Sequence, residues 1–138
     1  MAVDLAPVVR KLKLAPSKRP TVIGAPESFR DALAAELGRS VGDAIDEHHD
    51  WILLFARDRG TLETALPSAA EALESPGTLW IAYPKGSSKI QSDLTRDEGW
   101  DAVRGEDLMW LTLVSIDDTW SAFSLRHHKP GEARQTFR

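Results

Sequence analysis

A short loop rich in glycine, serine and lysine is the stretch whose residue types point most directly to binding chemistry. It reads Lys85-Gly86-Ser87-Ser88-Lys89 and follows an apolar run of strand length. A glycine, two hydroxyls and two ammonium groups can surround a phosphate or a carboxylate. The spacing G-x-x-x-x-G-K-[ST] of a nucleotide-binding loop is absent. The residue types are typical of a solvated loop, and if the chain has a small-anion site we expect it here.

Further candidate residues follow the other predicted strands at their carboxyl ends. In an open sheet of parallel strands, ligands bind beyond those ends. One group follows the first apolar run at Gly24, and Arg57 follows the run Trp51–Ala56. The candidate binding residues are Gly24, Ala25, Glu27, Arg57, Lys85, Ser87 and Ser88.

No arrangement of residues predicts catalysis or a metal centre. The histidines occur as adjacent pairs, His48-His49 and His127-His128, and adjacent side chains point apart on regular backbone. The H-E-x-x-H spacing of zinc enzymes is missing, and no serine lies in a G-x-S-x-G elbow. The chain has no cysteine, which excludes disulfides, thiol nucleophiles and thiolate metal sites. We predict no catalytic residue and no metal ligand.

Two unbroken apolar runs with an amphipathic helix between them set the fold. Trp51–Ala56 and Thr78–Tyr83 have the length and composition of buried strands, and residues 61 to 73 have one apolar helical face. This order predicts a βαβ crossover with both strands buried. Pro67 predicts a kink or two short helices, and Pro76-Gly77 predicts a turn that ends the helix with a positive φ.

The residues before the crossover predict a second unit of the same kind. Thr21–Gly24 is a short strand, and a helix follows Pro26 and ends at Gly38. By position Ser40–Ile45 should be a further strand, although Gly42 and Asp43 interrupt it.

The residues after the crossover predict a surface helix and a hairpin. Thr95 and Glu98 have the spacing of a capping box, so a helix should run from about residue 96 to 104. The turn Asp117-Asp118-Thr119 should join strands 108–116 and 120–125 in an antiparallel pair. Trp80 and Trp110 are expected in the core. Trp120 is expected to pack in the core or locally, with a half-exposed position at a pocket rim or subunit contact as the alternative.

These elements predict a three-layer α/β sandwich. Its sheet should be mainly parallel, with helices on both faces and a C-terminal antiparallel hairpin. We expect one Rossmann-like domain over residues 1–138, with a core from about 20 to 126 and flexible basic ends at 1–7 and 127–138.

The order of elements, with Pro76-Gly77 and a strand ending in Ala82-Tyr83-Pro84, resembles the back half of class I methyltransferases. Val22-Ile23-Gly24-Ala25 sits where that family has its glycine-rich cofactor loop. More specifically, Leu79–Lys85 together with Ile116–Ser121 resembles small bacterial proteins that have a reduced methyltransferase-type fold and no assigned activity. The resemblance implies a Rossmann-like scaffold and, in its full form, S-adenosylmethionine as cofactor.

The sequence departs from that family where the cofactor would bind. The family has G-x-G-x-G after its first strand, whereas Gly24-Ala25-Pro26-Glu27 has one glycine and then a proline. The family also ends its second strand with an acidic residue, for which Glu47 is the nearest candidate. We therefore expect no cofactor, with S-adenosylmethionine as the alternative.

Charge is distributed unevenly along the 138 residues, whose net charge is −4. Residues 1–20 carry +4 and residues 126–138 carry +3, which leaves −11 for the rest. Basic ends can hold nucleic acid, but an acidic body repels phosphate. We therefore interpret the ends as solvated and do not expect nucleic-acid binding. No apolar window has the length of a membrane span, and no signal peptide is evident, so we expect a cytoplasmic protein.

These features together predict a non-catalytic module that binds a protein or a small anionic ligand. The alternatives are an S-adenosylmethionine- or nucleotide-binding enzyme and a protein that binds nucleic acid through its basic ends. A homodimer could form at the hairpin edge or on a face that a missing helix leaves uncovered.

Overall fold

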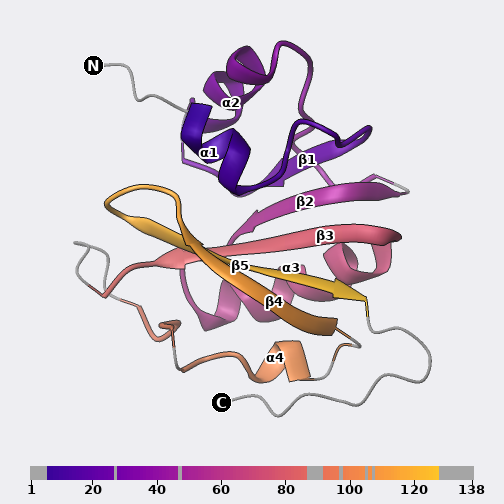
Figure 1. The fold of residues 1–138 in the computed structure, drawn as a ribbon. Helices are drawn as coiled ribbons and strands as arrows, with labels where there is room; N and C mark the ends of the chain where they lie inside the picture. The colour runs from indigo at the N-terminus through magenta and orange to yellow at the C-terminus, as the bar shows by residue number, and fades with distance from the viewer. Residues whose placement is uncertain are drawn as a thin grey trace.

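The computed structural model describes residues 6–26, 28–46, 48–86, 92–96, 98–104, 106 and 108–127. In these ranges α1 and α2 lie on one face of a five-stranded sheet, and α3 and α4 lie on the other (Figure 1). The predicted three-layer α/β sandwich is confirmed. The elements are α1 (Ala6–Lys11), β1 (Pro20–Ile23), α2 (Phe29–Leu37), β2 (His49–Phe55), α3 (Arg59–Ala72), β3 (Leu73–Pro84), α4 (Asp101–Arg104), β4 (Leu108–Ser115) and β5 (Trp120–His127).

The sheet has the strand order β1-β2-β3-β5-β4. β1 pairs with β2 and β2 with β3 in parallel, while β5 pairs with both β3 and β4 in antiparallel fashion. The sheet is therefore mixed rather than mainly parallel. The predicted hairpin is confirmed, and Asp117 fixes its turn because Oδ1 accepts the N–H groups of Thr119 and Trp120, each at 2.8 Å.

The strand predicted at Ser40–Ile45 is wrong, and its absence is the reason why the sheet is only partly parallel. One residue of this stretch, Gly42, bridges to Thr21 of β1. The Gly42 amide donates to the Pro20 carbonyl at 3.0 Å, and the Gly42 carbonyl accepts from Val22 at 2.9 Å. The chain then turns away, and the Thr21 hydroxyl donates to the Ala44 carbonyl at 2.8 Å.

The crossover β2–α3–β3 forms as the apolar runs predict. Alternate residues of β2 face opposite layers: Ile52 and Leu54 pack with α3, whereas Leu53 and Phe55 pack with the α1/α2 layer. α3 runs as one helix through Pro67. Asp58 caps it by accepting the Thr61 amide at 2.8 Å.

Pro76-Gly77 does not end the helix, so this prediction is wrong. α3 ends at Ala72 and β3 begins at once. β3 pairs with β2 at Leu73 and again at Thr78, whereas β2 advances only from His49 to Trp51. The four intervening residues of β3 therefore bulge. Gly77 fits there because a Cβ atom would overlap the Glu74 carbonyl oxygen.

The helix predicted at 96–104 shortens to four residues, and the residue before it, Trp100, is in the core instead of on the surface. The Glu98 amide donates to the Thr95 hydroxyl as predicted, at 3.2 Å, but Gly99 has φ +95° and interrupts the helical backbone. Trp100 is buried, with edge-on contacts to Tyr83, Trp110 and Phe123. Trp110 is half-buried in this aromatic cluster.

Trp120 is buried as well, which confirms the expected packing and not the half-exposed alternative. Its ring meets Phe55 edge-on at 5.0 Å between centroids, on the α1/α2 side of the sheet.

The N-terminal segment, residues 6–19, is held across the sheet by one shared carbonyl oxygen. The Leu12 carbonyl accepts hydrogen bonds from the indole N–H groups of Trp51, at 2.7 Å, and Trp80, at 3.0 Å. The residue four positions on is Pro16, which has no N–H to give. Val8, Leu12 and Leu14 are buried beside these rings. The described core therefore begins well before residue 20.

Asp50 fixes the end of the same segment. Its carboxylate accepts from the Ser17 hydroxyl at 2.5 Å and from the amides of Lys18 and Arg19 at 2.8 and 3.0 Å. Burial by itself would raise the pKa of Asp50, but these hydrogen bonds favour the charged form by more, so the pKa lies below its ordinary value.

Replacing Trp51 and Trp80 by phenylalanine tests the shared acceptor. Each single change should lower the free energy of unfolding by about 1–3 kcal/mol. The double variant should lose about 1 kcal/mol more than the sum, because the buried Leu12 carbonyl then has no donor. Urea unfolding of the four proteins measures this coupling. The matched pair Trp51→Phe and Trp120→Phe shares no acceptor and should be additive; equal coupling in both cycles would contradict the interpretation.

The Asp50→Asn variant tests the carboxylate. Because the folded-state pKa is lowered, the stabilisation is present above the unfolded-state pKa, near about 4, and is lost as pH falls through the folded-state value. The variant should therefore be less stable than the parent at neutral pH by about 1.5–3 kcal/mol. The difference should shrink in acid. Unfolding measured from neutral to acidic pH shows this, with Asp118→Asn, an exposed turn carboxylate, as the control. A gap independent of pH would argue against the role of the charge.

Candidate functional site

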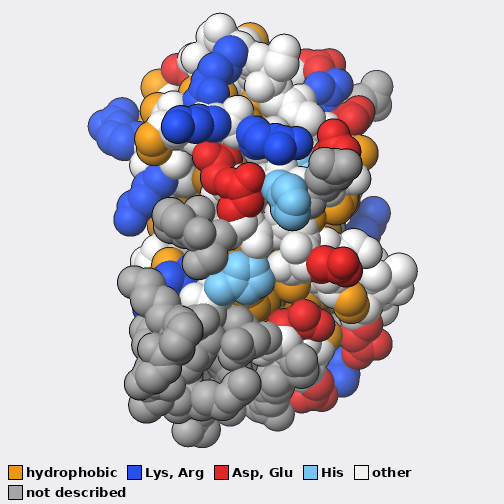
Figure 2. All heavy atoms as spheres, turned by 90° about the vertical axis from the view of Figure 1, so that its right-hand side faces the viewer, with side chains coloured by type: hydrophobic (Ala, Val, Ile, Leu, Met, Phe, Trp, Pro, Cys, Tyr) orange, Lys and Arg blue, Asp and Glu red, His pale blue; other side chains and the backbone are white. Residues whose placement is uncertain are grey.

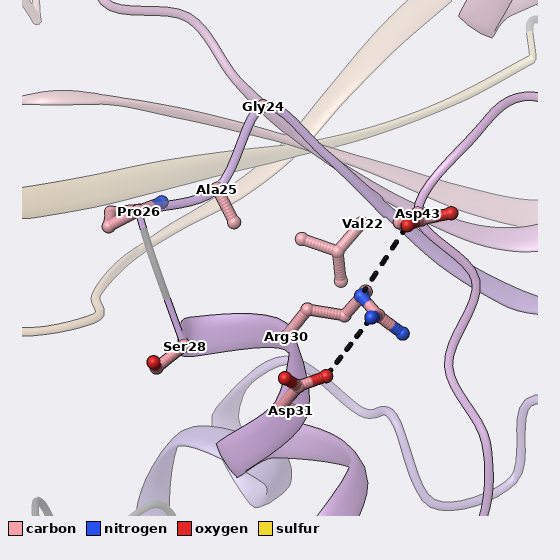
Figure 3. A pocket seen from close by; sticks show the side chains of 8 residues that line it. All are labelled: Val22, Gly24, Ala25, Pro26, Ser28, Arg30, Asp31 and Asp43. Atoms are coloured by element: carbon pink, nitrogen blue, oxygen red, sulfur yellow. Dashed lines mark ion pairs between the residues drawn. The ribbon is translucent and has the colours of Figure 1, made fainter.

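A shallow groove lies where β1 ends, between the β1–α2 loop, the first turn of α2 and the Gly42 stretch. Its volume is about 270 Å³. Figure 3 shows the side chains around it, with the Ala25 methyl group pointing into the hollow. The lining residues are Val22, Gly24, Ala25, Pro26, Ser28, Arg30, Asp31 and Asp43. Two of the predicted residues, Gly24 and Ala25, are brought together here.

Gly24 is required by the backbone rather than by a ligand. Its φ of +71° is in the left-handed region. A Cβ atom would lie 3.2 Å from the Phe55 carbonyl oxygen of β2. The glycine therefore permits the turn out of β1 and the close approach of β2.

Arg30 extends across the groove, and its contacts with two carboxylates determine the local charge. The guanidinium donates to the Val41 carbonyl at 2.9 Å, pairs with Asp31 at 3.0 Å and lies 4.0 Å from Asp43 (Figure 3). The side chains of Asp31 and Asp43 are 75% and 73% exposed, so water weakens both pairs. One cation beside two carboxylates leaves the groove with a local charge of −1.

Arg57 and Lys85 do not line the groove. The Arg57 carbonyl accepts from the Ser92 hydroxyl at 2.7 Å. The Lys85 ammonium donates to the Ser115 hydroxyl at 2.6 Å, and its amide donates to the Thr119 carbonyl at 2.8 Å. The lysine therefore ties the end of β3 to the hairpin. Glu27, Ser87, Ser88 and Glu47 lie outside the described residues.

The buried histidine, His49, has a structural environment. Its Nε2 accepts from the Asp46 amide at 2.9 Å, so the N–H belongs to Nδ1, which lies 2.9 Å from the Arg19 carbonyl. Both ring nitrogens thus form hydrogen bonds with backbone groups. Within the described ranges, no three His, Asp or Glu side chains converge as a metal site.

Sequence reasoning missed Arg30, Asp31 and Asp43 as groove residues. Arg30 and Asp31 lie on the first turn of α2, and a residue four positions beyond Pro26 on a helix faces the same loop. That spacing was available in the sequence. The place of Asp43 was not, because it follows from the single bridge at Gly42.

None of the helices in the described ranges is long and apolar enough to cross a membrane. No protein-family model matches this chain. A search of curated proteins likewise found no match.

Solved structures do match, at low sequence identity. The Bacillus subtilis M1A22 tRNA methyltransferase TrmK is 10% identical with a TM-score of 0.58, over 93% of this chain and 67% of that one. PigF with SAH is 11% identical with a TM-score of 0.58, over 93% and 62%. A protein of the NADB-Rossmann superfamily from Streptococcus agalactiae is 12% identical with a TM-score of 0.54, over 99% and 73%.

Other matched structures are much longer than this chain, which spans 59% of a ribosomal protein L11 methylase from Lactobacillus delbrueckii and 43% of an O-methyltransferase from Planctomyces limnophilus. At these identities the likeness concerns the fold. The chain is a Rossmann-like α/β domain. Its three parallel strands and antiparallel terminal hairpin resemble the fold of the matched methyltransferase structures.

The groove fits the cofactor of that fold only in part. Asp43 follows Gly42, the residue bridged to β1, and lines the groove. The volume of about 270 Å³, however, is at the small end for a ligand pocket. Arg30 also spans the opening. As far as the described residues define it, the groove is therefore small and partly filled by Arg30.

Gly24→Ala and Gly38→Ala form a matched pair for the glycine turn. Both residues have positive φ, +71° and +81°, but a Cβ atom at Gly38 would meet nothing within 4 Å. Gly38→Ala should cost about 1 kcal/mol of unfolding free energy for the left-handed conformation, and Gly24→Ala more than that because of Phe55. Thermal and urea unfolding compare the two. Equal losses would show that the contact with Phe55 is unimportant.

Proposed function

We propose that this protein is a non-catalytic binding module whose ligand site is the groove beside Gly24. The observation that carries the proposal is the position of Arg30, whose guanidinium is fixed across the opening by Val41, Asp31 and Asp43. Because the Arg30 side chain occupies part of the groove, the remaining space fits a small ligand but not an extended one. The local charge of −1 favours a neutral or cationic ligand.

The chemistry of the lining supports a role in binding rather than in catalysis. Ser28 is the lining residue with a hydroxyl that could act as a nucleophile, and no histidine is among the lining residues to serve as its base. Both carboxylates are engaged with Arg30. The groove thus offers hydrogen-bond acceptors and one guanidinium, which suffice for recognition.

The second candidate is a methyltransferase that binds S-adenosylmethionine. It is favoured by Asp43, which lies beside the end of β1. Matched structures named "PigF with SAH" and "DhpI-SAH complex structure" contain the demethylated cofactor on a similar fold, with TM-scores of 0.58 and 0.51. A carboxylate that accepts two ribose hydroxyls would need to leave Arg30, so this candidate requires the arginine to move.

Titration with adenosine and S-adenosylhomocysteine, followed by amide chemical shifts, separates the two candidates. For the binding module, adenosine should shift the amides of Gly24, Ala25 and Asp43, and S-adenosylhomocysteine should bind within about tenfold of adenosine, equivalent to 1.4 kcal/mol. S-adenosylmethionine should not be converted to S-adenosylhomocysteine. Much tighter binding of the homocysteine compound, or turnover, would establish the methyltransferase instead.

Two alanine replacements control for the place of binding. Ala25→Leu extends a side chain into the groove and should abolish the shifts (Figure 3). Ala35→Leu changes an exposed position on α2 that does not line the groove and should preserve them. No shift with either compound, or shifts that survive Ala25→Leu, would show that the groove is not the site.

A further inference from the structure

The anchored N-terminal segment presents a run of cations to solvent. The exposed basic residues are Arg10, Lys11, Lys13, Lys18 and Arg19. Residues 6–19 contain no acidic residue. We call these five side chains the basic strip. It carries a charge of +5 within ten consecutive residues.

The strip is fixed in place rather than attached to a solvated tail. Val8, Leu12 and Leu14 alternate with the cations and are buried against the sheet, so the cations must point outward. The indole N–H groups of Trp51 and Trp80 donate hydrogen bonds to the Leu12 carbonyl from the sheet. Figure 2 shows Lys and Arg side chains gathered over the upper part of the molecule, where α1, α2 and the start of β1 lie.

Arg39, which follows the C-cap of α2, adds a further cation beside the strip. Its guanidinium donates to the Ala15 carbonyl at 2.7 Å, and the residue is exposed. Within the described ranges, the strip itself forms no ion pair; the salt bridges found there involve Arg30 and Arg59. The Lys11 ammonium contacts a neutral acceptor, the Ser115 carbonyl, at 3.3 Å. In the described part of the chain, no carboxylate therefore forms an ion pair with these five side chains.

The acidic body does not prevent a polyanion from binding at this surface. Exposed charges farther apart than about 8 Å are largely screened at physiological ionic strength. A phosphate at the strip therefore interacts mainly with the cations it touches. Asp50 lies beside Lys18 and Arg19, and its oxygens accept hydrogen bonds from Ser17 and from the two backbone amides.

The positions of the exposed apolar side chains favour one class of polyanionic partner over the others. Among the described residues, the large exposed hydrophobics are Leu111 and Leu113, both on β4, the strand at the opposite end of the sheet order from β1. A membrane-surface helix needs an exposed apolar face, and a protein interface needs apolar or aromatic anchors. Single strands need aromatic side chains on which bases stack. The strip offers charge alone.

We propose that the basic strip docks the phosphate backbone of a double-stranded nucleic acid, without base readout. The binding is driven by release of counterions from the duplex. This role is independent of the groove beside Gly24, so either proposal can fail without the other.

Fluorescence anisotropy with a labelled duplex of about 20 base pairs, at about 50 to 200 mM salt, tests the proposal. Five phosphate contacts predict a slope of about −4.5 for the logarithm of the association constant against the logarithm of salt concentration. The variant Arg10→Gln with Arg19→Gln removes two contacts, so the slope should flatten by about 1.8. Circular dichroism and thermal unfolding confirm that the variant remains folded.

The matched control is Arg57→Gln with Arg96→Gln, which changes the net charge equally at two exposed positions outside the strip. This control should keep the parental affinity and slope. Equal weakening by both variants would assign binding to net charge and overturn the proposal. So would the absence of binding at low salt, a preference for the single strand, or equally tight binding to anionic lipid vesicles.

Discussion

One carbonyl oxygen, that of Leu12, attaches the N-terminal segment to two interior strands of the sheet. Leu12 closes the first helix, and its carbonyl has no donor along the chain because Pro16 follows four residues later. The indoles of Trp51 and Trp80, on adjacent strands β2 and β3, supply both hydrogen bonds. A buried acceptor left unpaired is costly, so this contact commits residues 6–19 to the α1/α2 layer. The basic strip and part of that layer's core depend on it.

The second constraint is the lost strand beside β1. Gly42 makes one bridge where a full parallel strand would complete the sheet. The stretch then turns away, which brings Asp43 to the groove and within 4.0 Å of Arg30. The single bridge at Gly42, in place of a full strand, therefore makes the sheet mixed. It also leaves one edge of β1 mostly unpaired by a strand and shapes the candidate site. A scaffold of the methyltransferase type thus has a groove that an internal arginine spans.

The sequence predicted the parts of the fold that depend on local pattern. The buried crossover from Trp51 to Tyr83, the glycine stop at Gly38 and the Asp117 turn were all confirmed. The errors occurred where tertiary contacts override local preference. The capping box indicated a helix, but Gly99 has a positive φ that interrupts it, and Trp100 packs in the aromatic cluster. Pro76-Gly77 became part of a bulge because β3 must pair with β2 in two registers.

By itself, the sequence determined the layers, the crossover and the carboxyl-end loops, because apolar periodicity and turn residues act over a few residues. It also marked Gly24 and Ala25, which line the groove. Only the tertiary structure decided that Arg30 and Asp43 meet there while Lys85 is bound to the hairpin, since those contacts join residues distant in sequence. It likewise turned a basic tail into a fixed surface, because two tryptophans meet one carbonyl only after the sheet has formed.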